Sequence, residues 1–459
     1  MQTQSSGKTF ILIVTTLSAF TGAFLMASLN IALPAVSREL SADAVMLGWL
    51  TIANIMTSAI LLIPIGRYAD THNRHRIYIV GSIIQATTSF LAAWAPNAIL
   101  LLIARIFHGI AASMTMVTYS AILLSAYPPN QRGRVLGINV AAVYIGISLS
   151  PLLGGFLTQN FGWRSIYIFS GCAVSIICIL LLWKLREEPV QNIPPPFDLP
   201  GAFILGITLF ALIWGLSELP DYTGIISIIV GVLSMVLFIY RESHTKHPLL
   251  DLNLFKNNAV FAFSNLAALI NYCATFSVSF LLSLYLQYIK GYSPQYAGLI
   301  MVIQPAIQAI VSPVSGRLSD KLEPRFLSSL GMALTAAGLI LLIFIGSQTP
   351  LSMVILILVI LGLGFGIFSS PNTNAIMGSV DKSLYSIASA VTSTSRTVGQ
   401  SLSLGIVTLL FAQIIGPQQI TESVYPLFLK SNSIAFTIFA FLCIAGIFAS
   451  LARGKTHNI

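Results

Sequence analysis

The sequence predicts an all-α protein that spans a membrane many times, and its composition, hydropathy and charge placement each support this fold class. Of its 459 residues, 56% are hydrophobic and only 8% are charged, whereas soluble domains contain about 25% charged residues. The apolar residues gather in runs of roughly 20, which is the helix length that crosses a bilayer. Short loops separate these runs, so no sizeable soluble domain is expected.

Charged residues, prolines and glycines bound the apolar runs and therefore define the expected helices in chain order. Six helices are expected in the first part of the chain, at 9–33, 46–66, 77–95, 98–126, 134–158 and 164–185. Eight more are expected after it, at 200–219, 223–240, 259–288, 293–316, 326–347, 350–378, 383–414 and 433–452. The sequence therefore predicts fourteen transmembrane helices.

The basic residues support this count and predict the orientation, because Lys and Arg gather in the cytoplasmic loops of membrane proteins. With fourteen alternating helices, most of the 23 basic residues fall on the side of the two termini. The opposite side receives only Arg38, Arg164, Lys290 and Lys430. Both termini are therefore predicted to be cytoplasmic. The net charge of +9 reflects this topology, so no nucleic-acid partner is expected.

The pattern Gly-Arg-x-x-Asp occurs twice after an apolar helix, about 250 residues apart. The two copies are Gly66-Arg67-Tyr-Ala-Asp70 and Gly316-Arg317-Leu-Ser-Asp320. Their spacing exceeds that of adjacent six-helix units by about two helices, and a Pro-rich stretch at 193–200 marks the start of an insertion. We therefore expect an N-terminal six-helix bundle at 1–190, a linker with two inserted helices at 191–245, and a C-terminal six-helix bundle at 246–459.

The first copy resembles the loop signature of the major facilitator superfamily, Gly-x-x-x-Asp-Arg-x-Gly-Arg-Arg. Gly66, Asp70 and Arg74 match this signature, whereas Thr71 replaces an Arg and Asn73 replaces the second Gly. The resemblance implies the major facilitator fold of a secondary transporter, in which this loop switches a cytoplasmic gate. The expected switch residues are Gly66, Asp70 and Arg74, together with Gly316, Arg317 and Asp320 of the second copy.

Two further segments resemble signatures of the same superfamily. Residues Arg105-Ile-Phe-His108-Gly are similar to its Arg-x-x-Gln-Gly signature, with His in place of Gln. The helix at 134–158 resembles its antiporter signature, Gly-x-x-x-Gly-Pro-x-x-Gly-Gly, and a proline kink beside small residues lets a neighbouring helix pack closely and pivot. The matching residues, also expected to act in conformational switching, are Gly146, Pro151, Gly154 and Gly155.

Together with the inserted helices, these segments resemble the fourteen-helix drug:proton antiporter branch of the superfamily. The resemblance implies a multidrug-efflux-like exporter of amphipathic small molecules in the cell membrane, working by alternating access. It implies the lipid bilayer as a further partner and no cofactor or metal, and we expect a monomer. An importer or uniporter of the same fold stays an open alternative.

One position departs from that branch and bears on the coupling ion and the substrate. The branch has an Asp in the first helix, nine residues before the proline that corresponds to Pro34, and this chain has Leu25 there. The acidic residues all fall in loops or at helix ends. An intramembrane carboxylate is the usual proton relay and the usual partner of a cationic drug. We therefore expect neutral, zwitterionic or anionic amphipathic substrates, and coupling to protons stays open.

Several polar residues are predicted at membrane depth, where such residues face protein or a water-filled path. The candidates for the substrate or coupling pathway are Arg105, His108, Asn30, Gln304, Gln308 and Arg396. For each Asn or Gln, an interhelical hydrogen bond is the alternative role. His108 either carries a proton, as the one buried residue expected to titrate near neutral pH, or only replaces the family Gln as a hydrogen-bonding partner.

A membrane-embedded lipid-modifying enzyme is the alternative from another class. Such an enzyme needs a nucleophile with its base, metal ligands or paired carboxylates gathered near the bilayer. No such grouping is visible in the sequence, and the four Cys residues lie within apolar segments as small hydrophobes. The sequence therefore favours a transporter over an enzyme.

Overall fold

The computed structural model describes residues 2–184, 197–246, 248–250, 252–319, 321–381 and 385–454. Within these residues, the regular elements are all helices. The first six are α1 (Gln2–Leu40), α2 (Ala44–Thr71), α3 (Arg74–Ala93), α4 (Ala98–Ala126), α5 (Pro129–Phe161) and α6 (Arg164–Lys184). A hairpin of α7 (Leu199–Ser217) and α8 (Tyr222–His244) follows them.

The second half of the chain contains the remaining helices. They are the short α9 (Asn253–Lys256), α10 (Ala259–Leu284) with its π-helical extension η1 (Tyr285–Ile289), α11 (Pro294–Met301), α12 (Ile303–Ser319), α13 (Pro324–Ile343), α14 (Leu351–Gly378), α15 (Tyr385–Ile414), the 3-10 turn η3 (Glu422–Val424) and α16 (Tyr425–Ala452). α11 and α12 together occupy the single helix that the sequence predicts at 293–316. Each of the fourteen predicted ranges therefore contains helix.

Side-chain caps explain where several of these helices begin. Each capping residue accepts a hydrogen bond from a backbone N–H two or three residues later, and such a cap contributes about 1 kcal/mol. The caps are Asp43, Asn73, Asn97, Asp198, Asn258 and Ser293. Asn73 stands where the loop signature has Gly, and it accepts from the N–H groups of His75 and Arg76. This departure from the signature thus starts α3.

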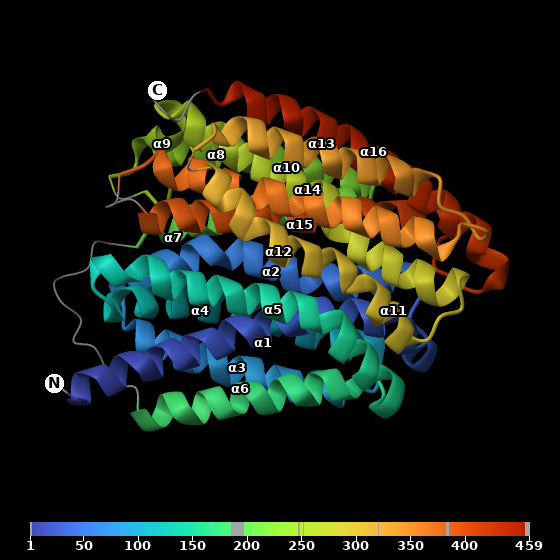
Figure 1. Ribbon diagram of the computed structural model, residues 1–459, viewed down its shortest axis with the longest axis horizontal. Coiled ribbons are helices and arrows are strands. Elements are labelled where there is room, and N and C mark those ends of the chain that lie inside the picture. Colours follow the sequence, from blue (N-terminus) through green and yellow to red (C-terminus); the bar gives the residue numbers. More distant parts are fainter. Residues whose placement is uncertain are drawn as a thin grey trace.

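Thirteen helices are long and apolar enough to cross a membrane, judged by length and composition within the described residues. The helix predicted at 77–95 is not among them, so fourteen apolar spans is one too many by this measure. Its counterpart α3 opens on Arg74, His75 and Arg76 and carries several Ser, Thr and Gln residues, which lower its mean hydropathy. α3 nevertheless packs along α4 and α6. Both chain ends lie at the same end of the molecule, as an even number of passes requires (Figure 1).

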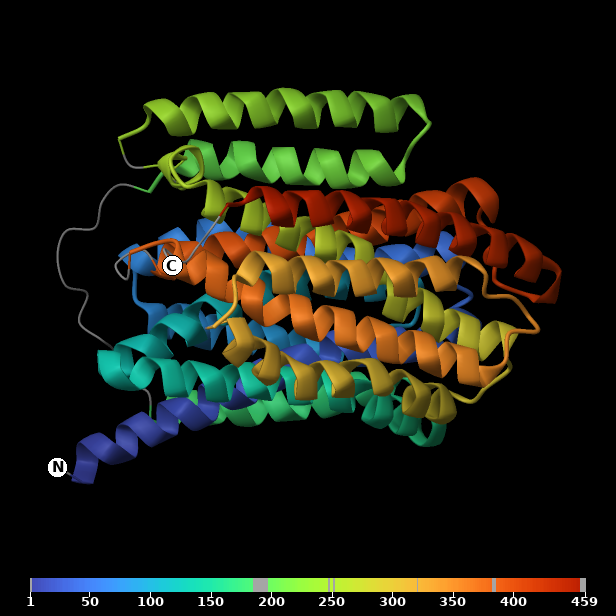
Figure 2. The ribbon, with the colours of Figure 1, turned by 45° about the horizontal axis from the view of Figure 1, so that its top comes forward.

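The long helices form two groups that lie side by side. In the first group, α1 packs against α5, α4 against α2 and α3, and α6 against α3. In the second, α14 packs against α12 and α13, and α16 against α10 and α13. The groups meet where α2 packs against α15 and α5 against α11. The α7–α8 hairpin lies outside both groups as the outermost layer (Figure 2), with α7 against α2 and α15.

The main cluster of buried apolar side chains draws on both groups of helices. It includes Leu25 of α1, which is only 1% exposed. The residue at the position of the branch's Asp is therefore an ordinary core residue that supplies no titratable group.

We call the end of the bundle that carries both chain ends the terminus end, and we call the other the opposite end.

Candidate functional site

The two groups of helices are joined by hydrogen bonds toward the opposite end. Ser283 of α10 donates its hydroxyl to the backbone oxygen of Asn30 at 2.6 Å, and Gln287 Nε2 donates to the oxygen of Ile31 at 2.9 Å. Pro34 lies four residues after Asn30 and has no N–H, so the Asn30 carbonyl lacks its usual helical partner. Gln287 lies in the π-helical turn η1, a feature often found at functional positions.

Two more hydrogen bonds connect the groups nearer the rim of the opposite end. The N–H of Ala44 donates to the backbone oxygen of Gln418 at 3.0 Å, and Gln419 Nε2 donates to the oxygen of Ser37 at 3.2 Å. Behind them, a Cβ at Gly48 of α2 would overlap the Thr408 hydroxyl of α15. The opposite end is therefore held closed by both hydrogen bonds and close backbone packing.

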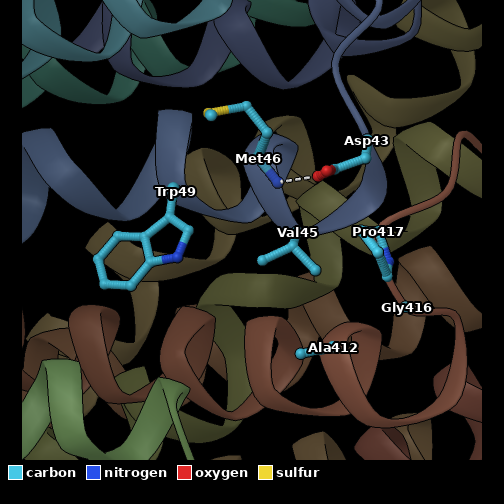
Figure 3. Close-up of a pocket in the computed structure, with 7 residues that line it drawn as sticks. All are labelled: Asp43, Val45, Met46, Trp49, Ala412, Gly416 and Pro417. Atoms are coloured by element: carbon cyan, nitrogen blue, oxygen red, sulfur yellow. Dashed lines mark hydrogen bonds between the residues drawn. The ribbon is translucent and has the colours of Figure 1, made fainter.

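Figure 3 shows a hollow at this rim, between the start of α2 and the end of α15. Asp43, which caps α2 through the N–H of Met46 at 2.7 Å, lies on one side of it, and Gly416 lies on the other. The hollow has a volume of about 230 Å³, whereas ligand pockets usually measure about 300–1,000 Å³. Its size and its place at the rim make it a surface feature of the closed end.

The antiporter-like segment of α5 faces two different neighbours. Gly146 and Gly154 approach α1 within the first group, where an added Cβ would stand 2.8 Å from the oxygen of Phe20 and 2.9 Å from Ser28 Cβ. Gly155 approaches α11 of the second group, where its Cβ would stand 2.5 Å from the oxygen of Pro294.

Pro151 takes part in the closest approach between the groups. A Cβ at Gly298 of α11 would overlap the Pro151 carbonyl oxygen, far inside van der Waals contact. α5 and α11 can therefore meet here only through glycine. The spacing of small residues in α5 thus serves one contact inside the first group and another between the groups.

A polar cluster at mid-depth contains the predicted Arg396. Its Nη2 donates to Thr373 Oγ1 of α14 at 2.8 Å, and its guanidinium carbon lies 5.5 Å from the centre of the Tyr272 ring of α10. The first group contributes Tyr144 of α5, whose hydroxyl lies 3.4 Å from Ser369 Oγ. Both groups of helices therefore contribute to one cationic and aromatic site.

Arg396 is not neutralised by a carboxylate in the described part of the chain. The ion pairs found there join Arg164 to Glu39 and Arg241 to Asp198, and both lie at helix ends. Arg396 Nε is buried and has no hydrogen-bond partner among the described residues. An unpaired guanidinium beside aromatic rings suits a ligand that carries electron-rich rings or negative charge and disfavours a cation.

Arg105 and His108 lie inside the first group and not at its boundary with the second. Arg105 is 2% exposed and donates from Nε to the backbone oxygen of Leu50 in α2 at 2.9 Å. His108 Nδ1 lies 3.4 Å from the hydroxyl of Thr88 in α3. The expectation that His108 is the one buried histidine is wrong, because His75 at the start of α3 is also buried.

The predicted amides lie at helix contacts. Gln308 is buried and Gln304 half-buried on α12, and the backbone at both positions approaches glycines of α14. Asn30 is buried, and its Oδ1 has no hydrogen-bond partner among the described residues. The backbone carbonyl of Asn30 therefore takes part in closing the opposite end, while its side-chain Oδ1 stays without a hydrogen-bond partner among the described residues.

The gate motif is described in part. Gly66 and Gly316 have ordinary van der Waals room for a Cβ, the nearest atoms lying 3.5 Å away in Val117 and 3.4 Å away in Ser370. Arg74 is the first residue of α3, and Arg317 lies in the last turn of α12. The Asp70 side chain and all of Asp320 lie outside the described residues, so their expected switching contacts stay predictions.

Sequence reasoning missed several of the polar residues that the fold brings together. Thr373, Ser369 and Tyr144 gather around Arg396, although single hydroxyls in apolar helices give no signal in a sequence. Arg453 follows the helix expected at 433–452 and was not among the candidates, yet it is 1% exposed and donates to Asn372 Oδ1 at 2.9 Å and to the oxygen of Pro324 at 2.8 Å. Its position directly after the last apolar helix was the available signal.

Antiparallel membrane helices in two groups, with a polar site at mid-depth built from both, define the class of polytopic membrane transporters. The chain belongs to the Major Facilitator Superfamily, whose family model matches residues 15–404. It is therefore a multi-pass membrane transporter, and its relatives are transporters and not enzymes.

Two curated relatives and one solved structure illustrate the similarity. The riboflavin transporter RibZ of Clostridioides difficile (strain 630) is 29% identical over 446 residues, which cover 96% of each chain. The multidrug resistance protein Stp of Mycobacterium tuberculosis is 27% identical over 383 residues, which cover 82% of this chain and 71% of Stp. A bacterial homologue of the human lysosomal transporter Spinster, solved in an inward-facing and unoccupied conformation, aligns with a TM-score of 0.70 at 17% identity, covering 98% of this chain and 97% of the other.

Proposed function

We propose that the protein is a secondary transporter that exports non-cationic amphipathic small molecules across the cell membrane by alternating access. The observation that carries this proposal is the cluster of Arg396, Tyr272 and Tyr144, to which both groups of helices contribute. Residues 1–190 and 246–459 act as the two moving bundles, and the hairpin within 191–245 travels beside them. A site shared by two bundles is exposed to one side and then the other when they rock.

The basic residues support the proposed orientation, in which the closed end is extracellular. Lys and Arg favour cytoplasmic loops, and they predominate at the end that carries the termini. The bonds of Ser283 and Gln287 to α1 then seal the site from the outside. Gly66, Asp70 and Arg74, with their second copy, act at the cytoplasmic gate.

Uptake of a flavin is a second candidate, favoured by a relative that is a riboflavin transporter. Riboflavin has a planar aromatic ring system and carries no positive charge, so it suits a guanidinium stacked near Tyr272. Several other relatives are multidrug resistance or efflux proteins. Both candidates predict the same central site, and they differ in the substrate and in the direction of transport.

Ligand-induced thermal stabilisation of the purified protein tests the site. A ligand at 100 times its Kd stabilises a protein by about 2.7 kcal/mol, so a specific substrate raises the melting temperature measurably. We expect riboflavin or neutral and anionic aromatic amphiphiles to stabilise the wild type and to lose this effect in Arg396→Gln. Arg164→Gln, at a helix end, is the matched control and keeps the effect. Equal stabilisation by a cationic dye in wild type and Arg396→Gln contradicts the proposed site.

Transport in membrane vesicles of known orientation separates the two candidates. The ligand identified by stabilisation is supplied to inside-out vesicles and to right-side-out vesicles with an imposed pH difference. An exporter accumulates its substrate in the inside-out vesicles. Accumulation of riboflavin only in right-side-out vesicles assigns the protein to uptake instead.

A further inference from the structure

Two buried carboxylates meet at the terminus end of the α7–α8 hairpin. Asp198 caps α7 and is 7% exposed, and Glu242 in the last turn of α8 is 4% exposed. Both lie against Gly201, where an added Cβ would stand 2.5 Å from Asp198 Oδ2 and 2.8 Å from Glu242 Oε1. The absence of a side chain at Gly201 lets these two oxygens approach the same point.

One oxygen of each carboxylate is satisfied and the other is not. Asp198 Oδ1 accepts from the N–H of Gly201 at 3.0 Å and from Arg241 Nη2 at 2.6 Å. Glu242 Oε2 accepts from the N–H of Leu250 at 2.9 Å. Asp198 Oδ2 and Glu242 Oε1 are buried without a hydrogen-bond partner among the described residues. Two buried carboxylate oxygens that face one point repel each other when both groups are ionised.

We propose that Asp198 Oδ2 and Glu242 Oε1 bind one proton between them, carried by Glu242 as an O–H that donates to Asp198. The surroundings decide which group carries it. Asp198 faces the Arg241 guanidinium and a backbone N–H, both of which stabilise a negative charge, whereas Glu242 accepts from the linker backbone. The shared proton satisfies both orphan oxygens and removes one of the two like charges.

The electrostatics of Asp198 agree with its role as the ionised partner. Burial by itself raises the pKa of Asp198, but the hydrogen bonds from Arg241 and the Gly201 N–H outweigh it and hold the pKa below its ordinary value. Among the described charged groups nearby, Arg241 comes from α8 and Arg67 from α2. His244 lies one turn from Arg241 on α8, and its Nδ1 is hydrogen-bonded to the backbone oxygen of Tyr240 in the same helix.

The shared proton affects how residues 248–250, which lead into the second half of the chain, are held. Glu242 holds the N–H of Leu250, while Arg67 of the gate motif donates from Nε to the oxygen of Leu249 at 3.0 Å and from Nη2 to the oxygen of Pro248 at 3.1 Å. Hydrogen bonds from the hairpin and from α2 therefore hold residues 248–250 in place. When the shared proton is lost, the two buried carboxylates repel each other. This repulsion weakens the hydrogen bonds that hold residues 248–250. The site thus makes the linker sensitive to protons independently of any substrate.

Infrared spectroscopy of the purified full-length protein tests the proton directly. We expect a C=O stretching band of a protonated carboxyl group at neutral pH, which shifts in heavy water and disappears as the pH rises. Glu242→Gln removes this component, because its amide replaces the O–H donor while its oxygen still accepts from Leu250. Asp221→Asn, at the exposed far end of the same hairpin, leaves the band unchanged. A band that is the same in wild type and Glu242→Gln overturns the proposal.

Hydrogen exchange at the Leu250 amide provides a second, independent measurement. We expect its protection factor, corrected for intrinsic base catalysis, to fall as the pH rises in the wild type and to stay constant in Glu242→Gln. Protection that is independent of pH in the wild type overturns the proposal. Protection that follows sodium concentration at constant pH also overturns it, because the oxygens then bind a metal cation instead of a proton.

Discussion

At the scale of single residues, cations inside the helix bundle are satisfied mainly by neutral groups. Arg105 donates to a backbone oxygen, Arg396 to a hydroxyl, and Arg453 to an amide oxygen and a backbone oxygen. Removing a charged group from water costs several kcal/mol after relaxation, and a hydrogen bond to a charged group returns about 1.5–3 kcal/mol. Loss of one neutral partner should therefore have a measurable effect.

The Arg453 site provides a stability prediction. Asn372→Ala removes the acceptor 2.9 Å from Arg453 and leaves part of a buried guanidinium unsatisfied, so we expect a loss of about 1–3 kcal/mol. The measurement is the thermal unfolding midpoint in detergent. Asn160→Ala, which alters an exposed side chain on α5, should shift the midpoint little. Equal shifts in the two variants would show that Asn372 is not an important partner of Arg453.

His108 provides a prediction about coupling. The imidazole lies between α3 and α4 beside Thr88, away from the boundary between the two groups, and Gln can make a similar hydrogen bond. We therefore expect His108→Gln to retain accumulation of substrate driven by a pH difference in proteoliposomes. If the variant keeps binding and downhill exchange but no longer concentrates substrate, His108 carries the proton.

At the scale of elements, α5 makes close backbone contacts both within the first group and with the second group. It approaches α1 through Gly146 and Gly154, and α11 through Gly155 and the Pro151 carbonyl. Without Cβ atoms the backbones approach closely, and a kink at proline allows the helix to bend between its two contacts. The glycines at the contact between α5 and α11 therefore allow the close approach of the two groups at the opposite end.

Gly298→Ala should weaken the closed opposite end. Its Cβ would overlap the Pro151 oxygen, and a backbone carbonyl cannot move aside without shifting a helix. We expect the equilibrium to move toward separation of the opposite end by about 1–3 kcal/mol, the usual size of such couplings. Distances between spin labels at Ala44 and Gln418 report this change. Gly137→Ala, in open space on α5, serves as the control and should leave the distances unchanged.

At the scale of the whole molecule, the proposed alternating access requires the opposite end to open and close. The described hydrogen bonds between Ala44 and Gln418 and between Ser283 and Asn30 join the two groups at this end. In the proposed mechanism, rocking of the bundles breaks these hydrogen bonds in each cycle. The hairpin packs against α2 of the first group and α15 of the second. A relative motion of the two groups would therefore change its contacts.

Cross-linking tests the rocking motion. In a background without the native cysteines, oxidation of Ala44→Cys/Gln418→Cys should abolish transport reversibly, because it ties the two groups together at the closed end. Ser329→Cys/Ser450→Cys joins α13 to α16 within one group, where the hydroxyls lie 3.0 Å apart, and should leave transport intact. Transport that survives quantitative cross-linking of the first pair contradicts alternating access through this end.

The sequence by itself determined the helices and the superfamily. Apolar runs, proline and glycine act locally, so each predicted range contains helix, and the absence of acidic residues from helix centres could be read from their positions alone. Apolarity was overestimated at α3, because its buried polar residues are tolerated by packing against α4 and α6.

Only the tertiary structure decided which residues meet. The two faces of α5, the burial of His75 and Arg453, the hydroxyls around Arg396 and the pairing of Asp198 with Glu242 all depend on how helices far apart in sequence are rotated and placed against each other. Hydropathy and periodicity describe one helix at a time, whereas these contacts join side chains from two or three helices. A helix end that looks solvated in sequence can therefore be buried by a neighbouring helix, as the end of α8 is beside the start of α7.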